Sequence, residues 1–174
     1  MKIGIILGST REGRVSPQVG EYIKQIGDKR EDASFEIVDI ADYNLPFLGT
    51  GPANQAWNDK INELDGYVFI VQEYNHGLSA ALKNAIDSAR QEWFNKAAGI
   101  VSYGSGGGIR AAEQVRTIMA EQSVATVRTH PAFNLFTDFE NMSVFKPGAH
   151  MEKGVEDMLD ELMLWSKAFK TIRP

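Results

Sequence analysis

The stretch KIGIILGSTREGRVSP, residues 2–17, decides the fold. Its apolar run Ile3–Leu7 is typical of a strand that is buried on both faces of a parallel sheet. The polar segment Gly8–Ser16 follows, and Pro17 suits the first turn of a helix that Ser16 is expected to cap. Apolar residues then recur at helical spacing: Val19, Tyr22, Ile23 and Ile26. The order is therefore strand, polar loop and helix.

The same order repeats along the rest of the 174-residue chain. Four more strands are predicted: Phe35–Ile40, Tyr67–Val71, Ala97–Ser102 and Val124–Arg128. The helices after them are expected to turn these residues inward: Trp57, Ile61 and Leu64; Leu78, Leu82, Ile86 and Ala89; Ile109, Ala112, Val115, Ile118 and Met119; and, in a last helix over residues 152–170, Val155, Leu159, Leu162, Trp165 and Phe169. Residues 41–51 and 129–150 are expected to be loops.

Alternating strands and helices predict a parallel sheet with helices on both faces, because crossover connections are right-handed. Five strands favour a flavodoxin-like three-layer α/β/α fold with strand order 2-1-3-4-5 over the six-stranded dinucleotide-binding order. Ligands of this fold bind beyond the carboxyl ends of strands one and three. No linker or repeat divides the chain, so a single domain over residues 1–174 is expected.

Composition limits the classes of function. Hydrophobic residues make up 43% and charged residues 24%, which is typical of a globular domain. The net charge of −5 argues against nucleic acid or an anionic membrane as the partner. The chain has no cysteine, so redox chemistry would need a bound cofactor. His130 and His150 have no partner at helical spacing, so no metal site is expected, and without an export signal the cytoplasm is the expected compartment.

The loop Gly8–Ser16 is predicted to bind an anion. It lies at a helix N-terminus, where free backbone N–H groups and the helix dipole favour negative charge. It carries these polar side chains: Ser9, Thr10, Arg11, Arg14 and Ser16. A phosphate monoester is the natural ligand, since neither the dinucleotide fingerprint nor the P-loop motif matches the loop. The alternative is an ordinary polar turn with a helix cap.

Two further polar turns follow strands three and four. In Gln72–Gly77, backbone N–H groups and Tyr74 are expected to meet a flat heterocycle, while Glu73 accepts from a ring N–H or pairs across a subunit boundary. His76 is either a general acid or, more commonly for a lone loop histidine, a surface residue. The glycine-rich turn within Tyr103–Ile109 allows the backbone to approach a ligand closely. The alternatives are a second phosphate-binding loop and a flexible turn that binds no ligand.

Arg110, directly after that turn, faces either substrate or solvent. The loop over residues 129–150 carries four phenylalanines: Phe133, Phe136, Phe139 and Phe145. They would cover a cofactor ring, pack against a second subunit or, as favoured, form a satellite core under a long loop.

Three ordered motifs, GSTREGR, EYNHG followed by LKNAIDS, and YGSGGGIRAAEQVR, resemble those of the NADPH-dependent FMN reductase family, which includes quinone, azo and chromate reductases. The resemblance spans about residues 1–130 and implies FMN as cofactor, with NADPH or NADH as co-substrate. This sequence departs from many members of the family in three places. Many members have a proline where this chain has Gln72, and another proline near the positions of Ser79 and Ala80. The stretch between Arg11 and Ser16 is also longer than in the commonest form of the motif.

The resemblance also implies roles for individual residues. For the FMN phosphate it implies side chains of Ser9, Arg11 and Ser16, with backbone help from Thr10, Val15 and Gln18. Around the edge of the isoalloxazine ring it implies Glu73, Tyr74, Asn75 and His76. On the pyrimidine side of the ring it implies Tyr103, Gly104, Ser105 and Gly106.

The function expected from this resemblance is a two-step transfer. NAD(P)H passes a hydride to the flavin, the nicotinamide leaves, and a quinone, azo compound, metal oxyanion or free flavin takes two electrons. No catalytic side chain is required, because the cofactor carries the chemistry. The alternatives are a flavodoxin-type electron carrier and a nucleotide-binding module without FMN. A homodimer or homotetramer is expected by resemblance.

Overall fold

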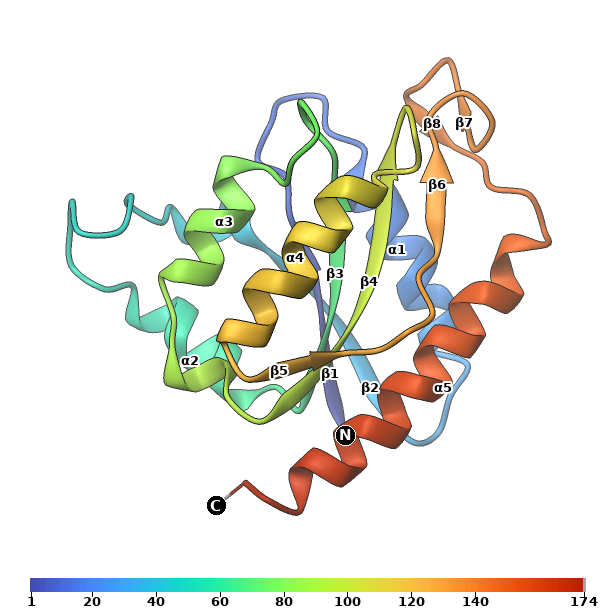
Figure 1. Ribbon diagram of the computed structural model, residues 1–174. Coiled ribbons are helices and arrows are strands. Elements are labelled where there is room, and N and C mark those ends of the chain that lie inside the picture. Colours follow the sequence, from blue (N-terminus) through green and yellow to red (C-terminus); the bar gives the residue numbers. More distant parts are fainter. Residues whose placement is uncertain (174) are drawn as a thin grey trace.

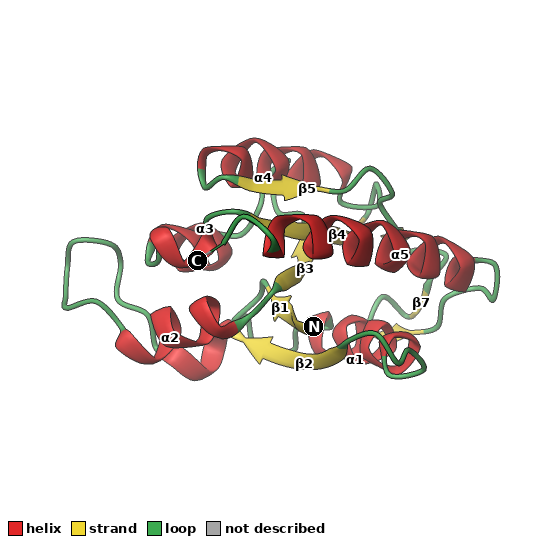
Figure 2. Ribbon diagram, turned by 90° about the horizontal axis from the view of Figure 1, so that it is seen from below, coloured by secondary structure: helices red, strands yellow, loops and turns green. Residues whose placement is uncertain are grey.

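The computed structural model describes residues 1–173 and contains a parallel sheet with strands in the order β2-β1-β3-β4-β5, which confirms the predicted order. The strands are β1 (Lys2–Leu7), β2 (Ser34–Asp39), β3 (Gly66–Gln72), β4 (Lys96–Gly104) and β5 (Val124–Thr126). Two helices, α1 (Ser16–Gly27) and α5 (Met151–Lys170), pack on one face of the sheet. Three helices, α2 (Gln55–Glu63), α3 (Ala80–Asp87) and α4 (Ile109–Glu121), pack on the other. Figures 1 and 2 show the resulting three layers.

Strands β1, β3 and β4 lie in the middle of the sheet and are covered on both faces, which explains their near-continuous apolar sequences. The face under α2, α3 and α4 contains the two fully buried tryptophans Trp57 and Trp93. Their indole N–H groups donate to the carbonyls of Ala85 (2.9 Å) and Ile86 (3.0 Å), so neither polar tip is left unsatisfied. Each large apolar side chain buried in this way contributes roughly 1.5–3 kcal/mol.

The fifth strand differs from the prediction. The expected strand Val124–Arg128 ends at Thr126, and a second segment, β6 (Ala132–Asn134), resumes parallel pairing with the same edge of β4. Pro131 has no N–H to continue the ladder, although its carbonyl still accepts from Ser102 (3.0 Å). The predicted loop over residues 129–150 therefore contains β6 and a small hairpin of β7 (Phe139–Glu140) and β8 (Val144–Phe145).

Some predicted inward-facing residues and helix starts are wrong. Ile109 is the first residue of α4 and is exposed, because the helix begins beyond the edge of the sheet. Trp165 is also exposed, since the buried stripe of α5 runs along the neighbouring positions Leu162, Met163 and Ser166. Helix α3 begins at Ala80 rather than near Leu78, because the Ser79 hydroxyl caps it through the N–H of Leu82 (3.0 Å).

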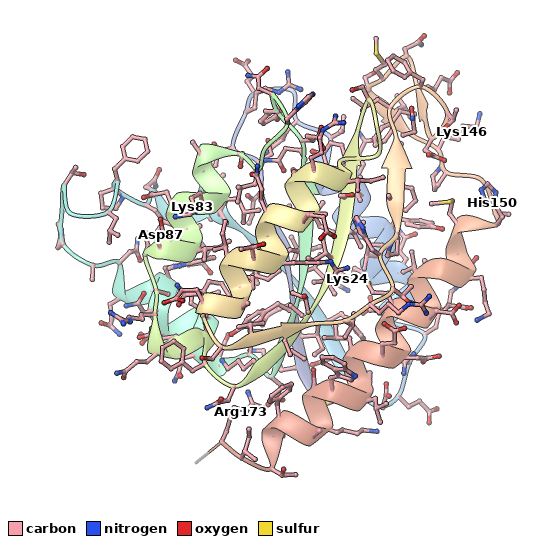
Figure 3. All side chains as sticks on the ribbon, in the orientation of Figure 1. Lys24, Lys83, Asp87, Lys146, His150 and Arg173 are labelled. Carbon is pink, nitrogen blue, oxygen red and sulfur yellow. The ribbon has the colours of Figure 1, made fainter. Side chains whose placement is uncertain are left out.

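Ion pairs hold the C-terminal residues at the lower end of the molecule. Arg173 lies there, as Figure 3 shows, and its guanidinium is 2.8 Å from the Asp65 carboxylate, which also pairs with Lys170. No helix within residues 1–173 is long and apolar enough to cross a membrane. The opposite, upper edge carries the loops that follow β1, β3 and β4.

Candidate functional site

Three segments meet at the upper edge of the sheet, where β1, β3 and β4 end (Figure 1). They are the first loop (residues 8–15), the tyrosine turn (residues 74–77) and the glycine turn (residues 104–108). Strand β1 lies next to β3, and β3 next to β4, so the three segments are neighbours in space although about thirty residues or more separate them in the chain. This is the switch point at which ligands bind in this fold.

The first loop starts very close to β3. The N–H of Gly8 donates to the carbonyl of Ile70 (3.1 Å), and a Cβ at position 8 would lie 2.7 Å from that same carbonyl oxygen. The Gly8 carbonyl accepts from the Ser79 hydroxyl (2.6 Å) and from the side-chain amide of Gln72. Gln72 and Ser79, which depart from the common family pattern, therefore have a structural role that the sequence did not reveal: they hold the start of the first loop.

The two arginines of the first loop have different roles. Arg14 is largely buried and forms a bidentate pair with Asp39 at the end of β2, and this hydrogen-bonded pairing raises the pKa of the guanidinium. Arg14 also donates to the carbonyl of Ser9, so it fastens the loop to β2. The Arg11 side chain is exposed and has no acidic partner within residues 1–173. Only Arg11 is therefore available to bind an anionic ligand.

Ser16 does not cap α1 as predicted. Val15 occupies the N-cap position and Ser16 is the first helical residue, with no side-chain capping bond. Its hydroxyl oxygen is buried and has no hydrogen-bond partner within residues 1–173, which costs roughly 1–3 kcal/mol for a buried polar group. The backbone N–H groups of Thr10, Val15 and Ser16 also have no acceptor within residues 1–173. A phosphate at this helix N-terminus would supply the missing acceptors, so these residues fit the phosphate group of FMN.

Ser9 contributes a second hydroxyl to the first loop. Its side chain is buried, and its oxygen lies 3.2 Å from the hydroxyl of Tyr74. This contact joins the first loop to the tyrosine turn. The ring of Tyr74 is 39% exposed, so one part of the side chain is tied to the loop while the rest faces the site.

Tyr103 and Gln18 also have structural roles that the sequence did not reveal. The Tyr103 side chain is buried on the α1 and α5 face, against Phe139 (5.8 Å between ring centres), and burial raises the pKa of its phenol. Its phenol lies near Ser16 and Tyr74, and its backbone leads into the glycine turn. The Gln18 N–H donates to the Val15 carbonyl (3.1 Å), and its side-chain amide binds the backbone of Ser143 and Phe145 (2.8 Å each). Gln18 therefore anchors the β7–β8 hairpin.

The tyrosine turn is a tight two-residue hairpin. Tyr74 and Gly77 exchange both backbone hydrogen bonds at 2.9 Å, and Asn75 and His76 have φ angles of 49° and 67°. Two successive left-handed residues define a type I′ turn, which asparagine accepts more readily than histidine. The N–H groups of Asn75 and His76 have no acceptor within residues 1–173, so they can bind a polar ring edge.

Glu73 is already occupied by the start of α4. Its carboxylate accepts from the N–H of Arg110 (3.0 Å) and pairs with the Arg110 guanidinium. It also lies 3.4 Å from the N–H of Ala111. Gly108, at the N-cap position, has no side chain to do this, so Glu73 caps the helix instead. Glu73 thus does not point a free carboxylate at a ring, and Arg110 is ion-paired.

The glycine turn has an unusual backbone. Gly107 and Gly108 have φ angles of 75° and 73°, and a Cβ at position 108 would lie 2.7 Å from the Tyr103 carbonyl oxygen. Glycine is therefore required at position 108. The N–H groups of Ser105 and Gly106 are at the exposed tip and have no acceptor within residues 1–173.

Two residues that sequence reasoning missed support the glycine turn from below. The Ser102 hydroxyl donates to the Gly107 carbonyl (2.5 Å), so it must accept its second bond from Nε2–H of His130 (2.8 Å). Burial lowers the pKa of His130 to about 4, which keeps the imidazole neutral at pH 7. Neither residue lies in a recognisable motif. The two side chains meet because β6 pairs with β4, which brings the segment that carries His130 beside Ser102.

Comparison with known proteins gives one family and solved structures of the same fold. Residues 1–138 match the family described as NADPH-dependent FMN reductase. An NAD(P)H-dependent FMN reductase of Schizosaccharomyces pombe is 31% identical over 98% of this chain and 91% of its own length. An NAD(P)H:quinone oxidoreductase of Solanum tuberosum is 35% identical over 68% of this chain and 66% of its own. The solved structure of FerB, an NAD(P)H:(acceptor) oxidoreductase of Paracoccus denitrificans, has a TM-score of 0.77 at 17% identity, covering 97% of this chain and 98% of that one.

Proposed function

Because the chain belongs to the NADPH-dependent FMN reductase family, we propose that it binds FMN at the upper edge of the sheet and transfers electrons from NAD(P)H to a small acceptor. The observation that carries this proposal is the first loop. Together with the start of α1 it offers three features that have no partner within residues 1–173: the Arg11 guanidinium, the buried Ser16 hydroxyl and the N–H groups at the N-terminus of the helix. This is the recognition set of a phosphate monoester.

FMN, when bound, accepts a hydride from NAD(P)H and passes two electrons to an acceptor, so that a quinone with one added proton becomes a hydroquinone. The chain's own residues bind and orient the cofactor. Arg11, Ser16 and the first-loop N–H groups would hold the phosphate. The N–H groups of Asn75 and His76 on one side, and of Ser105 and Gly106 on the other, would bind the polar edges of the ring.

An enzyme fits the chain better than an electron carrier. Curated relatives are named as NAD(P)H-dependent FMN reductases and quinone oxidoreductases, which are oxidoreductase enzymes. Glu73 is occupied by the start of α4, and His130 is bonded to Ser102 below the glycine turn, so neither is placed to exchange a proton with an acceptor. The cofactor would thus carry the chemistry while the protein positions it.

The test is a titration of the purified protein with FMN, followed by steady-state kinetics with NADH and with NADPH. We expect saturable flavin binding and rapid oxidation of at least one nicotinamide in the presence of a small quinone. A protein that binds FMN but oxidises neither nicotinamide at a useful rate would act as a carrier. A protein that never binds FMN would contradict the proposal.

We further propose that the whole chain acts as one domain, as a homodimer or homotetramer in the cytoplasm. The two apolar clusters on the faces of the sheet both use strands β1, β3 and β4, which supports one cooperative unit. Sedimentation velocity would give the oligomeric state directly, with a monomer at micromolar concentration as the contrary result.

A further inference from the structure

Three of the four phenylalanines in residues 129–150 are accounted for by the core. Phe133 is fully buried, Phe139 is nearly so, and Phe145 packs against both at 4.8 and 4.9 Å between ring centres. They pack inside the molecule, as favoured, but they join the main apolar cluster on the α1 and α5 face and do not form a separate satellite core. Phe136 is different, because 67% of it is exposed. Burying a phenylalanine stabilises the fold, so the exposure of Phe136 forgoes a stabilisation that its neighbours obtain.

The exposure of Phe136 is imposed by an ordered turn. The N–H of Phe136 donates to the side-chain oxygen of Asn134 (2.8 Å), and the N–H of Asp138 donates to the Asn134 carbonyl (2.8 Å). The Asp138 carboxylate in turn accepts from the N–H of Asn134 (2.8 Å). The backbone on both sides of Phe136 is therefore fixed, and the ring is presented to solvent by a rigid turn.

This turn is bonded directly to the glycine turn. The N–H of Leu135 donates to the Gly104 carbonyl, and the Asn134 amide donates to the Ser105 carbonyl, each at 3.0 Å. Strand β6 ends beside the end of β4, as Figure 1 shows, with Asn134 paired to Gly104. Phe136 is thus fixed next to the segment proposed to bind the ring of FMN.

Two other exposed apolar residues belong to the same edge. Ile109, 53% exposed, begins α4 directly after the glycine turn. Tyr74, 39% exposed, lies on the tyrosine turn, and its neighbour Glu73 is bonded to the start of α4. We call Tyr74, Ile109 and Phe136 the apolar rim. Within residues 73–77, 104–109 and 132–138 the two carboxylates are Glu73, which is paired with Arg110, and Asp138, which is nearly buried.

We propose that Phe136 is a specificity-determining residue, which with Tyr74 and Ile109 receives the flat ring of an uncharged aromatic acceptor, such as a quinone, at the mouth of the cofactor site. This proposal rests on the proposed function. A planar ring gains both apolar burial and aromatic contact at such a rim. A compact, highly charged acceptor gains neither, because removing its charge from water is costly.

The experiment compares Phe136→Ala with Leu164→Ala, both loaded with FMN and supplied with the same NAD(P)H. Leu164 is the control, because it is also 67% exposed but lies in the C-terminal half of α5. For a naphthoquinone, we expect kcat/KM of Phe136→Ala to fall about tenfold, mostly through KM, and Phe136→Tyr to retain most of it. For ferricyanide, a compact anion, we expect a change of less than about twofold.

A binding measurement removes the dependence on turnover. Calorimetric titration with a naphthol, which is planar but is not reduced, should give a several-fold weaker Kd for Phe136→Ala and an unchanged Kd for Leu164→Ala. Three results would overturn the assignment. The first is an equal loss of kcat/KM with naphthoquinone and with ferricyanide, and the second is an equal loss in the two alanine variants. The third is a smaller oligomer for Phe136→Ala. Wild-type protein that binds FMN yet reduces neither acceptor would instead contradict the proposed function, and the rim assignment with it.

Discussion

At the scale of single residues, the two arginines of the first loop are expected to affect different quantities: Arg11 the affinity for FMN, and Arg14 the free energy of unfolding. Arg11 has no partner within residues 1–173, whereas Arg14 is paired with Asp39 and with the Ser9 carbonyl. We expect Arg11→Ala to weaken FMN binding by about 10- to 100-fold, since a hydrogen bond to a charged group contributes roughly 1.5–3 kcal/mol. Fluorescence titration measures this. The same variant without FMN should unfold in urea like the wild type.

Arg14→Ala should show the opposite pattern in the protein without cofactor. It leaves the largely buried carboxylate of Asp39 without its partner, so we expect the free energy of unfolding to fall by about 1–3 kcal/mol. Urea denaturation followed by circular dichroism tests this. If Arg14→Ala were as stable as the wild type and Arg11→Ala were not, the assignment of the two side chains would be reversed.

The same pair shows what sequence can and cannot establish. Residue type and position place both arginines in an anion-binding loop, but they do not reveal which one is occupied. A signal was present: with strand order 2-1-3, Asp39 at the end of β2 lies beside the first loop. Ser16 is a similar case, because its identity is suited to capping while its actual position is one residue inside the helix.

At the scale of elements, Glu73 joins β3 to α4 by capping the helix through the N–H of Arg110. We expect Glu73→Gln to lower the free energy of unfolding by about 1–2 kcal/mol, because the helix loses a charged cap and Arg110 loses its partner. The matched control is Glu113→Gln on the exposed face of α4, which should change stability by less than about 0.5 kcal/mol. Equal stability of the two variants in urea would show that Glu73 is not a cap.

The support of the glycine turn by His130 predicts a pH dependence. The folded protein holds the pKa of this imidazole at about 4 by burial, with Arg116 as a secondary cause, against an ordinary value near 6.5. Between these values the unfolded chain binds a proton that the folded chain does not. The free energy of unfolding should thus fall as pH drops from 6.5 to 4, by up to about 3 kcal/mol, and the contribution of His130 is constant above pH 6.5.

His130→Gln removes the titrating group while keeping an amide that can donate to Ser102. We expect the urea midpoint of this variant to vary less between pH 6.5 and 4 than that of the wild type. His150→Gln is the control, since His150 is exposed just before α5 and lies away from the upper edge (Figure 3). Parallel pH profiles for the wild type and His130→Gln would contradict the assignment.

At the scale of the whole molecule, periodicity predicts the strands and the helices, because the buried strands are apolar throughout and the helices have a single apolar stripe. The number of strands, alternating with helices, favours the strand order that the structure has. The break in the fifth strand was not predicted. A three-residue segment such as β6 is too short to have a pattern, and its pairing depends on β4. The exposure of Phe136 in the apolar rim was not predicted for the same reason. Where β6 pairs with β4 decides which phenylalanine lies outside the core, and the sequence does not show that pairing.

If the first loop binds the phosphate of FMN as proposed, FMN and riboflavin, which lacks the phosphate, should differ in Kd, and measuring that difference is the most direct test. Several charge-assisted hydrogen bonds of roughly 1.5–3 kcal/mol each predict that FMN binds at least about 100-fold more tightly. Equal affinities for the two flavins would contradict the account.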